Sequence, residues 1–231
     1  MLDVPFGLVV FFIVTTLLFY FGFIWAMLKG SERVQKRVHV LALAILAWLI
    51  FQSTLTLNRW YMDREAMPPH IMFPVLFMFA MFALLAFTPR GKRFLNGLSL
   101  EVITWLHLVR IPVEIALYWL AFYKQAPWSM TFYGHNYDIV FGITAPIIAY
   151  FGIRKKKISP VIIKVWNILG VVSLLIIMIT AAGATATKIQ AWDFDRPNYA
   201  ITHFPFSWLP SFIAPMVLLA HIKALFFKGE K

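Results

Sequence analysis

Five polar or ionisable side chains share one face of a single long apolar stretch, residues 101–123. They follow one another at intervals of three, three, four and four residues: Thr104, His107, Arg110, Glu114 and Tyr118. On an α-helix this spacing keeps all five within an arc of about 120°. A cation, a carboxylate and an imidazole on one face are groups that can bind a polar ligand or move a proton.

Charge inside an apolar helix is costly, and the cost restricts where this face can point. Each charged side chain at the centre of a bilayer costs about 2.5–3.5 kcal/mol on insertion scales, so the face must meet other helices or a wet cavity. Arg110 and Glu114 are four residues apart and can pair within the helix. Pro112 lacks an N–H, so the carbonyl of Leu108 loses its helical donor and a kink is expected. Two interpretations stay open: an ion pair that locks the helix to its neighbours, or a site for a ligand, proton or substrate.

Other polar residues in apolar stretches are candidates to join this face. At 1.5 Å per residue, His107 lies ~7 Å and His221 ~5 Å to the cytoplasmic side of the membrane centre, so the two imidazoles can meet. Two histidines without a carboxylate at their level are a poor set of zinc ligands, so no metal site is predicted; axial binding of haem is conceivable on geometry, and the cofactor stays unknown. Gln52 lies near the level of Glu114. The predicted ligand-binding set is His107, Arg110, Glu114, Tyr118, Gln52 and His221.

A second polar group is expected at the outer mouth of the helices. It combines the segment before residue 139 with the long connection 188–210, and its members are His135, Asn136, Asp138, Asp195 and His203. These residues would line an entrance for a cation or a polar head group; capping of the next helix by Asn136 or Asp138 is the alternative. The aromatic residues of 188–210 fit either a belt at the lipid head groups or a lid over the bundle.

The elements that position these residues follow from composition. The chain is 61% hydrophobic and 13% charged, whereas soluble domains are about 45–50% apolar and about 25% charged. Continuous apolar runs of membrane-spanning length predict helices rather than a barrel, because barrel strands alternate apolar and polar residues. We therefore predict an all-α, polytopic membrane protein, with residues 1–231 forming a single seven-helix domain. The predicted helices are about 5–28, 38–57, 71–88, 101–123, 137–153, 165–187 and 209–227.

The distribution of basic residues predicts the orientation. Fifteen of the 21 Lys and Arg residues lie at 29–37, 89–98, 154–164 and 223–231, and the alternate connections hold five. Basic residues favour the cytoplasmic side, so the N-terminus is predicted outside and the C-terminus in the cytoplasm, as a multi-pass protein of the cytoplasmic (inner) membrane. This distribution indicates contact of the basic loops, above all 154–157, with anionic lipids rather than nucleic acid. With no cysteine in the chain, disulfides and thiolate sites are excluded.

The predicted function is binding of a small polar or amphipathic ligand in a cavity between the helices, with transport or sensing as its purpose. In this hypothesis Arg110 pairs an anionic group, Glu114 holds Arg110 or carries a proton, and His107 is a titrating relay. One alternative is an intramembrane enzyme that uses Glu114 and His107 as acid–base groups. Another is a non-catalytic subunit whose polar face meets a partner chain. The sequence specifies neither the ligand nor the oligomeric state.

Overall fold

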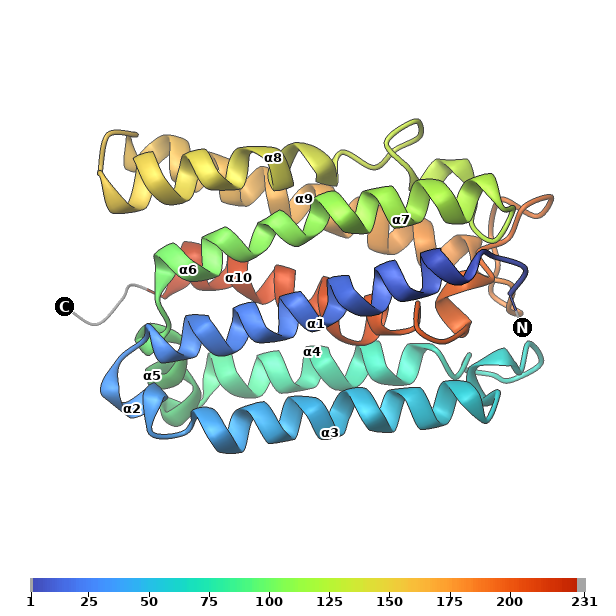
Figure 1. The fold of residues 1–231 in the computed structure, drawn as a ribbon, viewed down its shortest axis with the longest axis horizontal. Helices are drawn as coiled ribbons and strands as arrows, with labels where there is room; N and C mark the ends of the chain where they lie inside the picture. Colours follow the sequence, from blue (N-terminus) through green and yellow to red (C-terminus); the bar gives the residue numbers. More distant parts are fainter. Residues whose placement is uncertain (1, 228–231) are drawn as a thin grey trace.

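The computed structural model describes residues 2–227, and the regular structure within them is helical (Figure 1). The predicted all-α class is confirmed. The long helices run side by side along the longest axis of the molecule, and the connections gather at its two ends (Figure 1). A single Thr185–Asn198 bridge is the one β-type pairing among the described residues.

Four helical stretches of the described chain are long and apolar enough to cross a membrane, or five if one bent pair counts as a single span. The four are α1 (Phe6–Leu28), α3 (Val38–Leu57), α9 (Pro160–Ala184) and Leu209–Phe226, which joins the π-turn η6 (Leu209–Ile213) to α10 (Ala214–Phe226). The bent pair is α4 (Met72–Phe87) with α5 (Pro89–Gly97). Helix α9 begins five residues before the predicted start at 165, because Ser159 caps it and Pro160 takes its first position.

The two other predicted helices are built from consecutive helical pieces. Residues 100–122 comprise α6 (Leu100–Trp105), the 3₁₀ turn η2 (Leu106–Val109) and α7 (Arg110–Phe122). Residues 138–154 comprise α8 (Asp138–Ile147) and the π-turn η4 (Ile148–Arg154). The ring of Pro112 crowds the carbonyl of Leu108, and the backbone tightens into the 3₁₀ form at that turn. The expected irregularity is therefore present as a change of helix type.

A proline also fixes the last helix against α3. Pro215 has no N–H, so the carbonyl of Ser211 lacks its helical donor. The indole Nε1 of Trp48, on α3, donates to that carbonyl at 2.9 Å. In return, Trp208 Nε1 donates to the carbonyl of Leu49 at 3.2 Å. These two bonds join helices that are far apart in the sequence.

Short helices occupy connections at the basic end of the bundle. They are α2 (Glu32–Gln35) and α5, and the sequence analysis assigned both segments to connections. Helix α5 lies at 92° to α4. Thr88 caps it by accepting from the N–H of Gly91 at 3.1 Å. A Cβ atom at Gly91 would lie 2.3 Å from the carbonyl oxygen of Leu85, so only glycine allows α5 to fold back this closely on α4.

Burial differs sharply between helices. In the apolar window of 209–226, 61% of residues are buried, against 17% in α3. Large apolar side chains of α3, among them Val40, Leu43 and Leu57, are about two-thirds exposed. A helix this apolar and this uncovered is suited to contact lipid. The buried apolar side chains come mainly from α1, α7 and α10, and the polar site lies beside them where α7, α8 and α9 meet.

Candidate binding site

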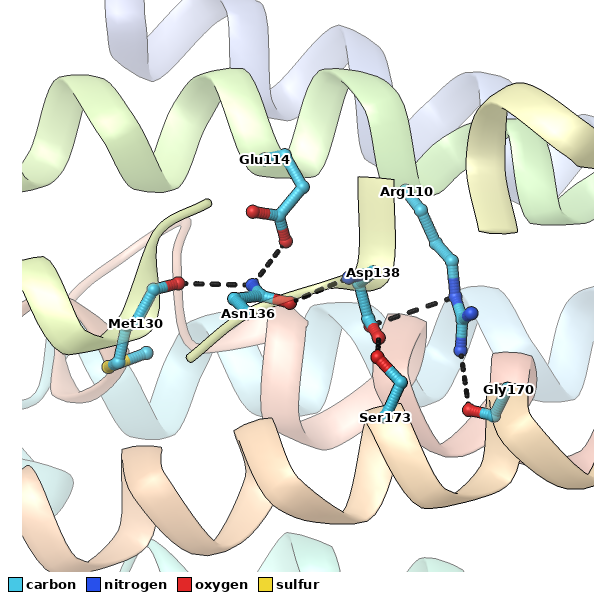
Figure 2. Close-up of polar contacts among 7 residues, drawn as sticks. All are labelled: Arg110, Glu114, Met130, Asn136, Asp138, Gly170 and Ser173. Carbon is cyan, nitrogen blue, oxygen red and sulfur yellow. Dashed lines mark hydrogen bonds and ion pairs between the residues drawn. The ribbon is translucent and has the colours of Figure 1, made fainter. Parts of the chain in front are cut away.

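A buried polar cluster joins α7, α8 and α9 inside the bundle (Figure 2). The Arg110 side chain is 3% exposed and its Nε lies 3.7 Å from Oδ2 of Asp138, whose side chain is 8% exposed. Arg110 Nη2 donates to the carbonyl of Gly170 at 3.3 Å. The ion pair expected between Arg110 and Glu114 within one helix does not form between these two described residues, because Arg110 reaches across to α8 instead.

A glycine on α8 permits this arrangement. A Cβ atom at Gly142 would lie 2.8 Å from Cγ1 of Ile111 and 3.3 Å from Cβ of Arg110. Helices α7 and α8 therefore meet almost backbone to backbone just beyond Asp138. That close approach brings the first residue of α8 within reach of the guanidinium.

Glu114 is held by a different partner. Its Oε1 accepts from Nδ2 of Asn136, which also donates to the carbonyl of Met130 at 3.0 Å (Figure 2). Asn136 Oδ1 accepts from the backbone N–H of Asp138 at 3.0 Å, and Asp138 Oδ1 accepts from Ser173 Oγ at 2.5 Å. Asn136 and Asp138 thus belong to one network with Arg110 and Glu114. The residue before α8 is Tyr137, and it makes no side-chain cap bond.

Within the described part of the chain, the network leaves three buried side-chain atoms without hydrogen-bond partners. They are Oε2 of Glu114 and both Nε and Nη1 of Arg110. The guanidinium also lies 5.1 Å from the ring centroid of Phe141, a cation–π distance. An unsatisfied buried polar atom costs about 1–3 kcal/mol, and more when it is charged. Such atoms in an otherwise ordered network mark a place that a further polar group would complete.

A cavity of about 220 Å³ adjoins the cluster. Arg110, Glu114, Asn136 and Asp138 line it, and apolar side chains of α4, α7, α9 and α10 form most of the remaining wall. A cavity of about 150 Å³ holds benzene, whereas drug-sized ligands need about 300–1,000 Å³. The space therefore suits a compact molecule with an apolar body and one polar end.

The long connection 188–210 contributes to the same cavity. Ile189, Ile201, Leu209 and Pro210 line it. In contrast, Phe194 is 67% exposed. One part of the connection thus covers the cavity, and another part faces outward.

The two histidines form a separate buried pair. The ring centroids of His107 and His221 lie 4.1 Å apart, and His221 Nδ1 is 2.9 Å from Oδ1 of Asn167. Neither ring lines the cavity. His107 Nδ1 and His221 Nε2 have no hydrogen-bond partner among the residues that the structure describes. A Cβ atom at Gly170 would lie 2.3 Å from the His221 ring, so Gly170 separates the pair from the Arg110 cluster.

Tyr118 and Gln52, the remaining members of the predicted set, lie elsewhere. Tyr118 stacks on Phe132 with centroids 5.5 Å apart. Gln52 accepts from the hydroxyl of Tyr61. Neither Tyr118 nor Gln52 lines the cavity. The ligand-binding set assembled from the sequence is thus split among four places, and of its six members only Arg110 and Glu114 line the cavity.

The predicted outer entrance is also divided. Asn136 and Asp138 are buried and line the cavity, whereas His135 and Asp195 are exposed and do not. His203 is half-buried, with Nδ1 2.8 Å from the carbonyl of Tyr199. Burial lowers the pKa of His203. The part of the chain that the structure describes contains no group of three or more His, Cys, Asp or Glu residues placed to hold a metal ion.

Sequence reasoning missed the contribution of α9. Asn167, Gly170 and Ser173 are spaced three residues apart and face the His pair, the Arg110 guanidinium and Asp138 respectively. The signal was present as small and polar residues at helical spacing within an apolar run, WNILGVVS. Polar residues at this spacing in a membrane-type helix indicate a face that packs against other helices.

Comparison with known proteins gives a family and no function. A family model described as a domain of unknown function (DUF8737) matches residues 67–227, so the chain belongs to that family. No curated protein and no solved structure matches the chain. The matched range includes every residue of the polar cluster.

Proposed function

We propose that this member of the DUF8737 family is a seven-span membrane protein that binds a small amphipathic molecule in the cavity beside Arg110 and Glu114. One observation carries the proposal: Oε2 of Glu114 and Nη1 of Arg110 are buried without a hydrogen-bond partner among residues 2–227, and both residues line a mainly apolar cavity. A ligand with a polar end would satisfy these atoms while its apolar body fills the rest of the space.

The charges of the site favour a ligand that donates hydrogen bonds. Arg110 already has Asp138 and the Gly170 carbonyl as partners, and Glu114 adds a second carboxyl group. One cation and two carboxyl groups disfavour an anion, so this proposal replaces the anionic ligand expected from the sequence. An amine is the preferred head group, because an ammonium donates to Glu114 and balances the charge of the cluster.

Seven spans are supported by the lengths of the composite helices. Residues 100–122 and 138–154 are continuous helical stretches of 23 and 17 residues, close to the ~20 residues needed to cross a bilayer. With seven spans, the basic connections fall on one side and the N-terminus on the other. The proposed location is the cytoplasmic membrane, with anionic lipid at 154–157.

Cysteine labelling tests the topology, because the natural chain has no cysteine. Tyr133→Cys is decisive, since Tyr133 is 74% exposed between the two composite helices. An impermeant maleimide added to intact cells should label Tyr133→Cys and Arg64→Cys, and should label Lys156→Cys only after permeabilisation. If Tyr133→Cys also requires permeabilisation, the two composite helices do not cross and the seven-span proposal is wrong.

A matched ligand series tests binding. Toluene, benzyl alcohol, benzylamine and benzoate share one apolar body and differ in the polar end. We expect the unfolding temperature of the detergent-solubilised protein to rise most with benzylamine. In Glu114→Gln, a benzylamine concentration roughly tenfold higher or more should be needed for the same rise in unfolding temperature. Asp195→Asn is the control, since it removes the same charge from an exposed residue outside the cavity. Equal effects of toluene and benzylamine would contradict the proposal.

Neither alternative function gains a supporting contact. His107 lies against His221 and outside the cavity, so Glu114 and His107 do not share a substrate space. The face expected to meet a partner chain is instead turned inward, since Thr104, His107, Arg110 and Glu114 are all buried. The cavity proposal is the one that these contacts favour.

A further inference from the structure

A second and larger hollow lies between α3 and α4, on a different side of α10 from the polar cluster. It measures about 1,010 Å³ and is lined by apolar side chains of both helices, with further contributions from α1 and α10. Trp48 of α3 and Phe77 of α4 stack with centroids 4.6 Å apart and an interplanar angle of 19°. We call this hollow the α3–α4 groove.

The groove extends along about half of a membrane span. Its wall on α3 runs from Leu41 to Phe51, which is ~15 Å at 1.5 Å per residue. The hydrocarbon core of a bilayer is ~30 Å thick, so the groove matches one leaflet. Ala44 and Ala47 lie on its wall and are exposed, so the groove is accessible from outside the bundle.

Three arginines rim the groove at its basic end: Arg37, Arg90 and Arg93. They come from the start of α3 and from α5, which lies across that end of the bundle (Figure 1). All three are exposed, and none forms an ion pair within the described part of the chain. Among residues 2–227, no acidic side chain lines the groove. The rim therefore offers positive charge without internal compensation.

We propose that the α3–α4 groove binds one phospholipid with an anionic head group. The three arginines bind the phosphate and the further negative charge of the head group, and an acyl chain lies along the groove toward Trp48 and Phe77. Charge complementarity selects an anionic lipid, and a depth of one leaflet selects a lipid over a soluble anion. This inference rests on the proposed membrane location, but it does not involve the cavity beside Glu114.

Native mass spectrometry tests the proposal on the full chain released from nanodiscs of phosphatidylcholine containing a minor fraction of phosphatidylglycerol. The wild type should retain one phosphatidylglycerol in preference to phosphatidylcholine. Arg37→Gln, Arg90→Gln and Arg93→Gln together should reduce this preference by roughly fivefold for each arginine removed. The matched control replaces Lys155, Lys156 and Lys157 by Gln, which removes equal charge from a basic loop outside the groove, where only diffuse attraction of anionic lipid is expected. It should reduce the preference of the retained lipid much less than the arginine triple does.

A second pair of variants tests the groove itself with the arginines intact. Ala44→Phe fills the groove and should abolish retention of the bound lipid. Leu43→Phe enlarges a neighbouring side chain that is 65% exposed and does not line the groove, and it should have no effect. Equal losses in the arginine and lysine triples would show diffuse attraction only and overturn the proposal. Retention unchanged in Ala44→Phe, or a second copy of the chain in place of lipid, would also overturn it.

Discussion

Replacement of Asp138 by Asn removes the charge opposite Arg110 while keeping the shape of the side chain. Asn at this position can still accept from Ser173, but the guanidinium, 3% exposed, loses its ion pair at 3.7 Å. Removal of one partner from a buried pair typically costs about 3–5 kcal/mol, because the remaining charge stays desolvated. Glu114 lies in the same cluster and partly compensates, so we expect about 3 kcal/mol. For a chain of this length that corresponds to a decrease of about 6–12 °C in unfolding temperature.

The assay is thermal unfolding of the detergent-solubilised protein, followed by the fluorescence of its nine tryptophans. A double-mutant cycle that combines Asp138→Asn with Arg110→Met measures the interaction energy between Arg110 and Asp138 apart from their other contacts. Arg110→Met alone leaves two buried carboxyl groups without their cation, so it should also cost about 3 kcal/mol. The double variant should be more stable than either single variant, with a coupling energy of at least about 2 kcal/mol.

An exposed ion pair with nearly the same nitrogen–oxygen distance provides the control. Nζ of Lys36, the C-cap residue of α2, lies 3.6 Å from Oε1 of Glu32, and the two side chains are 73% and 84% exposed. Exposed pairs at this spacing contribute about 0.3–0.5 kcal/mol, so Glu32→Gln should change the unfolding temperature by no more than about 2 °C. Additive losses in the Arg110–Asp138 cycle, or equal effects of Asp138→Asn and Glu32→Gln, would refute the argument that burial gives this pair its importance.

Three further predictions concern single residues. Gly170→Ala places a Cβ atom 2.3 Å from the His221 ring, so overpacking should destabilise the fold by about 1–3 kcal/mol in the same thermal assay. Tyr61→Phe removes the hydroxyl that donates to the fully buried Gln52 and should cost about 1–3 kcal/mol. Because burial lowers the pKa of His203, the folded state resists its protonation; stability should fall as pH drops through the unfolded-state pKa of about 6.5, and less so in His203→Gln.

Each of these predictions has its own control. Gly7→Ala adds a methyl group where no atom lies within 4 Å, so it should not destabilise the chain. Tyr20→Phe removes a hydroxyl that donates to the Ala42 carbonyl at 3.1 Å in a partly buried position, and a smaller loss than that of Tyr61→Phe is expected. For His203, an identical dependence of stability on pH in the wild type and in His203→Gln would show that protonation of His203 does not cause the loss of stability at low pH.

The sequence was sufficient to predict the long apolar helical segments, because apolar runs bounded by charged or proline-rich connections are a local signal. The ends of α1 and α3 lie within one residue of the predicted 5–28 and 38–57. The short helix α5 was missed because its signal is different: a Thr-Pro start followed by basic residues looks like an ordinary cytoplasmic loop. The bend between α4 and α5 depends on the close contact of Gly91 with Leu85, and the hydropathy of the sequence does not reveal such a contact.

The polar cluster was predicted only in part, because helical spacing within one segment says nothing about partners on other segments. Arg110 and Glu114 were found from their spacing, and Asp138 was assigned to the outer entrance. Their meeting depends on Gly142, where α7 and α8 touch. The sequence also grouped Tyr118 with Arg110 because both lie on one face. That face is long, and Tyr118 at its C-terminal end packs instead against aromatic residues of the next connection.

The central claim is that the polar end of a small ligand completes the hydrogen bonding of Glu114. An experimentally determined map of the protein with bound benzylamine tests it most directly. We expect density for the ring in the cavity of about 220 Å³, with the amine nitrogen within hydrogen-bond distance of Oε2 of Glu114. Benzylamine bound elsewhere, or a cavity closed by direct contact between Glu114 and Arg110, would contradict it.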